Sequence, residues 1–220
     1  FEVRLFRDNR VFAFSSLAAL INYGSTFAVS FLLSLYLQHV RGLGPGTAGA
    51  VLLWQPVVMA LLSPVAGRLS DRAQPRLIAS LGMGMSSLGL LLLTFLGRDG
   101  AILYVILCLV CLGIGFALFS SPNMNAIMGS VAPHHYGIAS GAVGAMRLIG
   151  QMCSMAIALV VFALVLGSHG EQGGNHPALP QALTICFGIF SILCGVGIVF
   201  SLARGNLRRE WQPAKENHEH

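Results

Sequence analysis

The chain has 220 residues, of which 55% are hydrophobic and only 10% are charged, and its formal net charge at pH 7 is +5. A soluble globular domain carries about 25% charged residues, so this composition excludes a protein with an ordinary water-facing surface. The basic residues gather in short segments between long uncharged stretches, which argues against nucleic-acid binding and indicates a membrane topology signal instead.

Six apolar stretches, five of them without any charge, are long enough to cross a bilayer, whose hydrocarbon core of about 30 Å requires roughly 20 apolar residues in a helix. Segments rich in glycine and proline, or carrying charges, separate these stretches. The sequence therefore predicts an all-α membrane protein with six transmembrane helices, at residues 11–37, 47–66, 77–96, 101–128, 137–166 and 182–203.

The distribution of Lys and Arg predicts the orientation of these helices. With six spans, most of the 13 basic residues lie on one side of the membrane, and of the loop residues only Arg41 and Arg98 lie on the other. Because cytoplasmic segments are enriched in Lys and Arg, we expect both ends of the chain to be cytoplasmic. Residues 1–10 then form a lead-in, 11–203 the bundle and 204–220 a tail. Because the chain starts at Phe rather than Met and shows no signal peptide, we also expect a fragment of a longer protein.

The first predicted span carries a polar stripe. Asn22, Thr26, Ser30 and Ser34 follow one another at intervals of four, and Tyr23 lies beside them. Residues four apart share one helix face, so the stripe lines either a water-filled cavity or a seam between two helices. We expect it to contribute substrate-cavity residues, namely Asn22, Tyr23, Thr26 and Ser30.

The second predicted span is interrupted by proline. Pro56 and Pro64 each remove a backbone hydrogen-bond donor and bend the helix. In a membrane such backbone is tolerated where other groups satisfy it. Gln55, next to the first of these prolines, is therefore expected to face the cavity.

The fourth predicted span ends in a polar segment. Pro122, Asn123 and Asn125 combine a helix-bending proline with two amides near the predicted cytoplasmic end. The segment is expected to form a kinked cytoplasmic gate, and the alternative is a helix terminus that only satisfies its own carbonyl groups.

Arg147 is the only charged residue within the six predicted spans. It lies about 15 Å into the fifth span at roughly 1.5 Å per residue, near the bilayer midplane. An arginine there costs at least about 2.5–3.5 kcal/mol on insertion scales, so it should face a cavity or a partner. Gln151, one turn away, can accept a hydrogen bond from it. Arg147 is expected either to act in function or to brace helices through their carbonyl groups.

The predicted spans lack the residue sets of an enzyme. No span combines His, Asp or Glu into a metal site or pairs a nucleophile with a base, so we expect no enzyme, no metal and no cofactor. All five cysteines lie in apolar stretches, which does not fit a secreted disulfide framework. Cys108 and Cys111 have the spacing of a redox or zinc pair, but without a nearby His or carboxylate we expect them to be packing residues.

The basic segment between the second and third spans, residues 67–76, reads GRLSDRAQPR. Its opening resembles the loop motif of the major facilitator superfamily, which is glycine, any residue, leucine, a small residue, aspartate and a basic residue. An aspartate at the membrane surface can interact with the positive amino end of a neighbouring helix. The resemblance implies a conformational-switch loop formed by Gly67, Asp71, Arg72 and Arg76. The alternative is a solvated basic turn.

Three further stretches, at 31–38, 122–131 and 137–151, resemble the fourteen-span drug:proton antiporter branch of this superfamily, which exports multiple drugs. The resemblance is to the carboxyl-terminal six-helix half. It implies two three-helix units in inverted topology, an amino-terminal half that is missing from this chain, and the plasma (inner) membrane of a prokaryote.

From the resemblance we expect half of a secondary active transporter that exports drugs or amphipathic organic compounds, coupled to protons, by alternating access. Its partners would be the lipid bilayer, the missing amino-terminal half, a small organic substrate and protons, with no nucleic acid. One alternative is a carrier for a small organic anion that binds Arg147. An alternative from another class is a membrane scaffold or sensor domain without transport.

Overall fold

The computed structural model describes residues 9–72, 74–97, 100–167 and 179–203, but at Asp71, Leu166 and Gly167 it describes the backbone alone. The described residues form helices and no strand. In chain order these are α2 (Arg10–Leu35), the π-helical turn η1 (Tyr36–Val40), α3 (Pro45–Leu52), α4 (Trp54–Arg72), α5 (Pro75–Thr94), α6 (Ile102–Gly129), the 3-10 turn η2 (Pro133–His135), α7 (Tyr136–Gly167) and α8 (Leu179–Ala203). They make six segments that are long and apolar enough to cross a membrane, which confirms the predicted all-α, six-span fold. Most of the predicted lead-in and the whole predicted tail lie outside the described residues.

Proline and asparagine account for several helix boundaries. Pro45 and Pro75 are the first residues of α3 and α5, where the missing N–H would have no intrahelical partner. The side chain of Asn9 accepts a hydrogen bond from the backbone N–H of Phe12 at 2.9 Å and caps α2.

The second span consists of two helices, since a break at Leu53 separates α3 from α4. Pro56 provides the reason, because its ring clashes with the carbonyl group four residues earlier and it cannot donate a hydrogen bond to that group. Pro64 lies inside α4 without ending it. The span also continues beyond its predicted end at residue 66, because neither Pro64 nor Gly67 ends α4, which runs to Arg72.

The first span ends in a π-helical turn that the sequence did not predict. Tyr36 is buried in this turn, and its hydroxyl donates a hydrogen bond to the carbonyl oxygen of Gly97 at 2.8 Å. The turn therefore ties the end of the first span to the end of the third.

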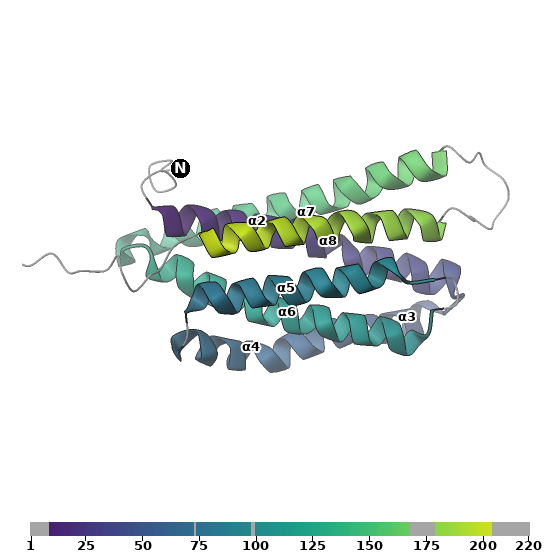
Figure 1. The fold of residues 1–220 in the computed structure, drawn as a ribbon, viewed down its shortest axis with the longest axis horizontal. Coiled ribbons are helices and arrows are strands. Elements are labelled where there is room, and N and C mark those ends of the chain that lie inside the picture. The colour runs from purple at the N-terminus through teal and green to yellow at the C-terminus, as the bar shows by residue number, and fades with distance from the viewer. Residues whose placement is uncertain (1–8, 73, 98–99, 168–178, 204–220) are drawn as a thin grey trace, which may run out of the picture.

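The six spans pack as two groups of three (Figure 1), with α2, α7 and α8 in one and α3–α4, α5 and α6 in the other. The main helix pairs are α2 with α7 and α8, α6 with α4 and α5, and α5 with α8. Exchanging the first three spans with the last three converts this set of pairs into itself, since α2–α7 becomes α6–α4 and α5–α6 becomes α8–α2. This is the packing expected of two units with inverted topology.

Glycine allows the closest helix crossings. A Cβ atom added to Gly82 on α5 would lie 2.6 Å from the carbonyl oxygen of Gly115 on α6. A Cβ atom added to Gly150 on α7 would lie 2.5 Å from the carbonyl oxygen of Leu20 on α2. These backbones approach as closely as small residues permit in membrane helix pairs.

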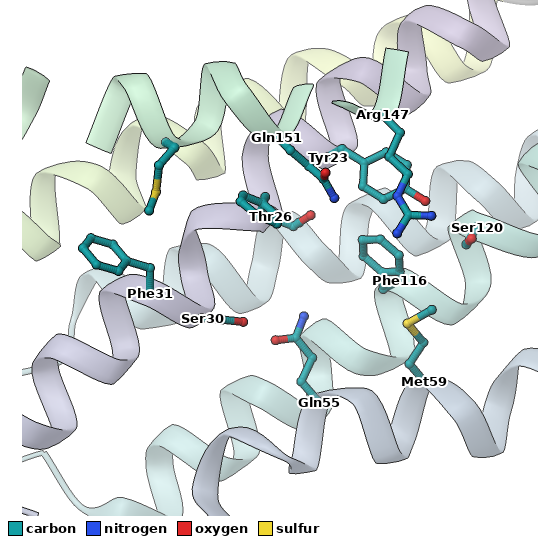
Figure 2. A pocket seen from close by; sticks show the side chains of 12 residues that line it. Tyr23, Thr26, Ser30, Phe31, Gln55, Met59, Phe116, Ser120, Arg147 and Gln151 are labelled. Carbon is teal, nitrogen blue, oxygen red and sulfur yellow. The ribbon is translucent and has the colours of Figure 1, made fainter. Parts of the chain in front are cut away.

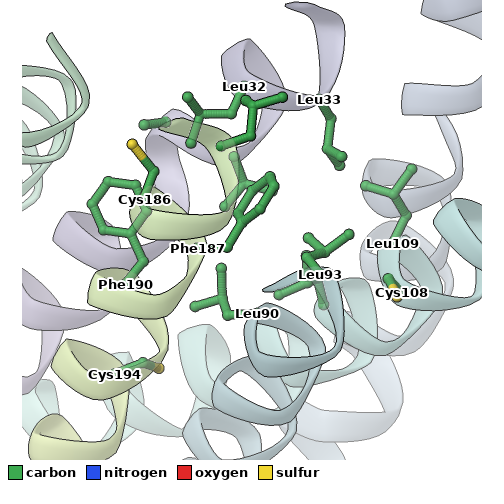
Figure 3. Close-up of a cluster of buried hydrophobic side chains, with 14 of the residues drawn as sticks. Leu32, Leu33, Leu90, Leu93, Cys108, Leu109, Cys186, Phe187, Phe190 and Cys194 are labelled. Carbon is green, nitrogen blue, oxygen red and sulfur yellow. The ribbon is translucent and has the colours of Figure 1, made fainter. Parts of the chain in front are cut away.

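A continuous apolar core joins the two groups (Figure 3). Buried leucine and phenylalanine side chains from four helices meet there, among them Leu32, Leu90, Leu93, Leu109 and Phe187. Cys108, Cys186 and Cys194 are free thiols buried in the same cluster. The burial of Cys108 agrees with its expected packing role, and Cys111 is half-buried.

Serine side chains form a polar seam between α5 and α8. Ser87 Oγ donates a hydrogen bond to the carbonyl oxygen of Ser191, and Ser191 Oγ donates one back to the carbonyl oxygen of Ser87, both at 3.0 Å. The hydroxyl groups of Ser80 and Ser201 are hydrogen-bonded at 2.8 Å. The seam therefore links the two helix groups through side chains as well as through apolar contact.

One end of the bundle gathers the start of α2, the end of α4, the start of α5 and the end of α8 (Figure 1). Arg10, Arg68, Arg72 and Arg76 lie on these segments, whereas Arg41 follows η1 at the opposite end. This separation is the one on which the topology prediction depends. The orientation of the bundle in a membrane stays a prediction.

Candidate functional site

A cavity of about 520 Å³ lies between α2, α4, α6 and α7 (Figure 2), within the range of about 300–1,000 Å³ typical of small-molecule sites. Both helix groups contribute to its wall. The lining residues are Tyr23, Thr26, Phe27, Ser30, Phe31, Gln55, Met59, Phe116, Ser120, Arg147, Gln151 and Met155. The structure thus brings together six of the seven residues that the sequence assigns to a cavity, from three different spans.

Arg147, Tyr23 and Phe116 form a stack across three helices. The Cζ atom of Arg147 on α7 lies 5.2 Å from the centroid of the Tyr23 ring on α2, which is a cation–π contact. The Tyr23 ring meets the Phe116 ring of α6 edge-on, with centroids 5.3 Å apart and an interplanar angle of 69°. The stack holds the guanidinium group at the cavity wall (Figure 2).

The charged and amide groups of the wall have polar atoms without a hydrogen-bond partner in the part of the chain that the structure describes. Among the described residues, the Arg147 guanidinium group forms neither a hydrogen bond nor an ion pair, and its ring contact is the one with Tyr23. The side chains of Gln55 and Gln151 likewise have no hydrogen-bond partner in the described part of the chain. Gln55 points into the cavity from α4, opposite Arg147 and Gln151 (Figure 2). The expected bond between Arg147 and Gln151 is not formed here.

The polar stripe of the first span divides between cavity and interior. Thr26 and Ser30 line the cavity, and Thr26 Oγ1 also donates a hydrogen bond to the Asn22 carbonyl oxygen at 2.7 Å. Asn22 differs from its predicted position, because its side chain is fully buried and does not line the cavity. Each step of four residues turns the stripe by about 40° around the helix, which takes Asn22 into the packed side of α2. Within the described residues neither polar atom of its side chain has a hydrogen-bond partner.

The predicted cavity residues, chosen for their polar groups, do not include the apolar part of the wall. Phe27 and Phe31 follow Tyr23 at intervals of four, so the three aromatic rings share one face of α2. This spacing is the signal that would have identified them. Met59 and Met155 likewise follow Gln55 and Gln151 at an interval of four, whereas no predicted cavity residue on α6 points to Phe116 and Ser120.

The predicted gate residues lie at the end of α6, where two amides hold neighbouring helices. The side-chain amide of Asn123 donates a hydrogen bond to the Ser15 carbonyl oxygen of α2 at 3.1 Å, and that of Asn125 donates one to Ser70 Oγ of α4 at 3.3 Å. Pro122 is buried inside α6 and does not end it. This arrangement braces α6 against its neighbours. A gating role stays a prediction.

The predicted switch loop is largely helical. Residues 67–72 form the last turns of α4, and Gln74 has the extended backbone expected before a proline. A Cβ atom added to Gly67 would lie 3.2 Å from Ser121 Oγ, so this glycine packs on α6. Arg72 is exposed, and Arg76 Nε donates a hydrogen bond to Gln74 Oε1 at 2.9 Å. The side chain of Asp71 lies outside the described structure, and the segment lines no part of the cavity.

Known proteins resemble this chain over most of its length. The sequence model of the Major Facilitator Superfamily matches residues 15–219. The riboflavin transporter RibZ of Clostridioides difficile is 28% identical over 201 residues, which cover 91% of this chain and 44% of the relative. The uncharacterized transporter YebQ of Escherichia coli is 33% identical over 172 residues, covering 78% and 36%. The multidrug resistance protein Stp of Mycobacterium tuberculosis is 30% identical over 186 residues, covering 83% and 34%. The chain spans less than half the length of each of these relatives.

Proposed function

The chain belongs to the Major Facilitator Superfamily, a family of transporters rather than enzymes, and we propose that it is the carboxyl-terminal half of a proton-coupled exporter of amphipathic organic compounds. The observation that carries this proposal is the cavity between α2, α4, α6 and α7, whose wall combines unpaired polar groups with aromatic and thioether side chains. Such a mixed wall suits organic molecules that have both apolar and polar surfaces.

The exposure of the spans supports a second half opposite this cavity. Within the most apolar 18-residue stretch of each span, only 11% of the residues are buried in Pro45–Ser70 and 22% in Pro133–Val165, against 39% to 67% in the other four. These two spans contribute Gln55 and Arg147 to the cavity wall. A complementary half would cover both spans and close the cavity, in keeping with relatives more than twice as long.

The internal braces support movement of this half as a rigid body. The amides at the end of α6 and the serine seam between α5 and α8 connect helices that are far apart in the sequence. Alternating access in transporters of this kind moves one half against the other around a fixed site. We expect the segment with Gly67, Asp71, Arg72 and Arg76 to bias that movement at the cytoplasmic surface of a prokaryotic inner membrane.

The test is transport by the full-length protein that contains this chain, reconstituted in liposomes with an imposed pH gradient. Riboflavin and ethidium serve as fluorescent probes, and a dye in the lumen reports proton movement. We expect at least one probe to cross the membrane in the direction opposite to that of the protons. Gln55→Ala and Arg147→Ala should reduce this flux at matched protein content. Leu81→Ala is the control, because Leu81 is 67% exposed on α5 and does not line the cavity. Folded protein that moves neither probe, whichever side of the membrane is made acidic, would contradict the proposal.

A further inference from the structure

The charge of the cavity wall has one sign. Among the residues that line the cavity, Arg147 is the only one with a charged side chain. No Asp or Glu occurs within any of the six spans. Inside a site that is partly shielded from water, one cation attracts anions and repels cations more strongly than it would in bulk solvent. This half of the wall therefore favours a ligand with negative charge or with exposed acceptor atoms.

The donors of the wall are arranged for a flat acceptor edge. A guanidinium group is a planar fork that binds two acceptor oxygens side by side, as in a carboxylate. The contact with Tyr23 fixes the orientation of this fork, while its N–H groups have no acceptor among the described residues. Gln55 and Gln151 offer further amide donors and acceptors at the same cavity.

The apolar part of the wall is arranged for a flat ring system. Tyr23 and Phe116 already form an edge-to-face pair, and aromatic rings gain about 0.5–1.5 kcal/mol from such contacts beyond simple burial. Phe27 and Phe31 line the cavity and keep 47% and 36% of their surface exposed, so their rings are available to a ligand. Met59 and Met155 add the polarizable sulfur atoms that pack well against rings.

We propose that this cavity binds planar aromatic compounds that carry an anionic, hydrogen-bond-accepting edge, such as a carboxylate or phenolate. The edge lies on Arg147 with help from Gln55 or Gln151, and the rings lie against Tyr23 and Phe116. The proposal rests on the proposed transport function for its setting, and it adds the chemical class of the substrate.

The test measures binding to the full-length protein in lipid nanodiscs by titration calorimetry at pH 7. Three probes separate charge from planarity: 2-naphthoate, the cation 2-naphthylmethylammonium, and the saturated anion decahydro-2-naphthoate. We expect 2-naphthoate to bind at least about tenfold more tightly than the cation, the size expected of charge-assisted hydrogen bonds. Its advantage over the saturated anion should be about three- to tenfold, the size expected of aromatic contacts.

Variants assign each preference to its residue. Arg147→Gln should weaken 2-naphthoate by about tenfold and remove the preference for the anion, whereas Arg147→Lys should keep that preference with weaker binding. Tyr23→Leu should remove the preference for the planar ring. Arg10→Gln and Phe14→Leu are matched controls, because these residues form a second arginine–aromatic pair outside the cavity. The Cζ atom of Arg10 lies 5.4 Å from the centroid of the Phe14 ring.

The two proposals fail separately in this design. Equal affinity for the anion and the cation, or a preference that Arg147→Gln leaves unchanged, would overturn the proposed substrate class even if riboflavin or ethidium is transported. Selective binding of 2-naphthoate that Arg147→Gln abolishes would support the substrate class even if no probe is transported, which would count against transport alone.

Discussion

Replacing Gly82 with alanine should separate α5 from α6, whereas replacing Gly84 on the same helix should not. A Cβ atom at Gly82 would lie 2.6 Å from both the Gly115 carbonyl oxygen and the Phe119 amide nitrogen, and 2.8 Å from the Leu118 carbonyl carbon. All three atoms belong to the α6 backbone, so no side-chain rotation can relieve the clash. At Gly84 no atom lies within 4 Å of the added Cβ.

The magnitude follows from contact distances. Non-bonded heavy atoms prefer about 3.5–4.0 Å, so the two backbones must separate by about 1 Å to accommodate the methyl group. Overpacking of this kind costs about 1–3 kcal/mol. Alanine also has a higher helix propensity than glycine, by about 0.8–1.0 kcal/mol, but this gain applies to both variants and cancels in their difference. Gly82→Ala should therefore be about 1–3 kcal/mol less stable than Gly84→Ala.

Reversible unfolding of the purified full-length protein in mixed micelles, with increasing dodecyl sulfate and helicity as the signal, measures the free energy of unfolding of both variants. Equal values would refute the close backbone crossing of α5 and α6. If Gly84→Ala were the less stable variant, the face of α5 that packs on α6 would be the one with Gly84, which would contradict the structure.

Four further predictions follow from the contacts of the described residues. Gly150→Ala should push α2 from α7 and lower 2-naphthoate affinity in the calorimetric assay, because the new methyl group would meet the α2 backbone beside the ring that stacks on the guanidinium group. Asn123→Ala should lower the free energy of unfolding by about 1 kcal/mol or more and speed proteolysis at the end of α6, because the buried hydrogen bond to the Ser15 carbonyl oxygen is lost. Ser87→Ala and Ser191→Ala should each lower the free energy of unfolding by about 0.6–1.7 kcal/mol and should combine nearly additively, because each removes one hydroxyl donor while alanine keeps the backbone carbonyl that accepts from the other serine. Asn22→Leu should raise the free energy of unfolding by about 1–3 kcal/mol, because it removes two buried polar atoms without partners in the described structure.

Span number and helix type were predictable because they depend on properties that vary along the chain. A run of about 20 apolar residues between breakers is visible without knowledge of packing, and so is the break before Pro56. The family resemblance carried by the segment at 67–76 is confirmed by the match to residues 15–219, although that segment is helical up to Arg72 rather than a loop.

The direction in which each side chain points was less predictable, because every span has apolar residues on all of its faces. In a soluble helix the contrast between polar and apolar faces identifies the buried side, but here lipid-facing and core-facing residues are both apolar. Asn22 and Ser30 belong to the same polar stripe, yet one is fully buried and the other lines the cavity. Their difference depends on the positions of α6, α7 and α8 around α2, which the local sequence does not encode. Tyr36, at the π-helical turn, likewise has its hydrogen-bond partner, Gly97, two spans away in the sequence.

The geometry of the cavity wall and the stability of the bundle both depend on how the two helix groups are joined. The cavity wall takes Arg147 from the group of α2, α7 and α8, and Gln55 from the group of α3–α4, α5 and α6. Their separation across the cavity is therefore set by contacts between the groups, chiefly the serine seam and the apolar core between α5 and α8. A change at Ser87 or Ser191, which do not line the cavity, should alter the spacing of the two polar groups that a ligand would bridge. Affinity for 2-naphthoate in the Ser87→Ala, Ser191→Ala double variant should accordingly fall while its preference over the cationic probe is retained, because the charge of Arg147 is untouched and only its distance from Gln55 changes.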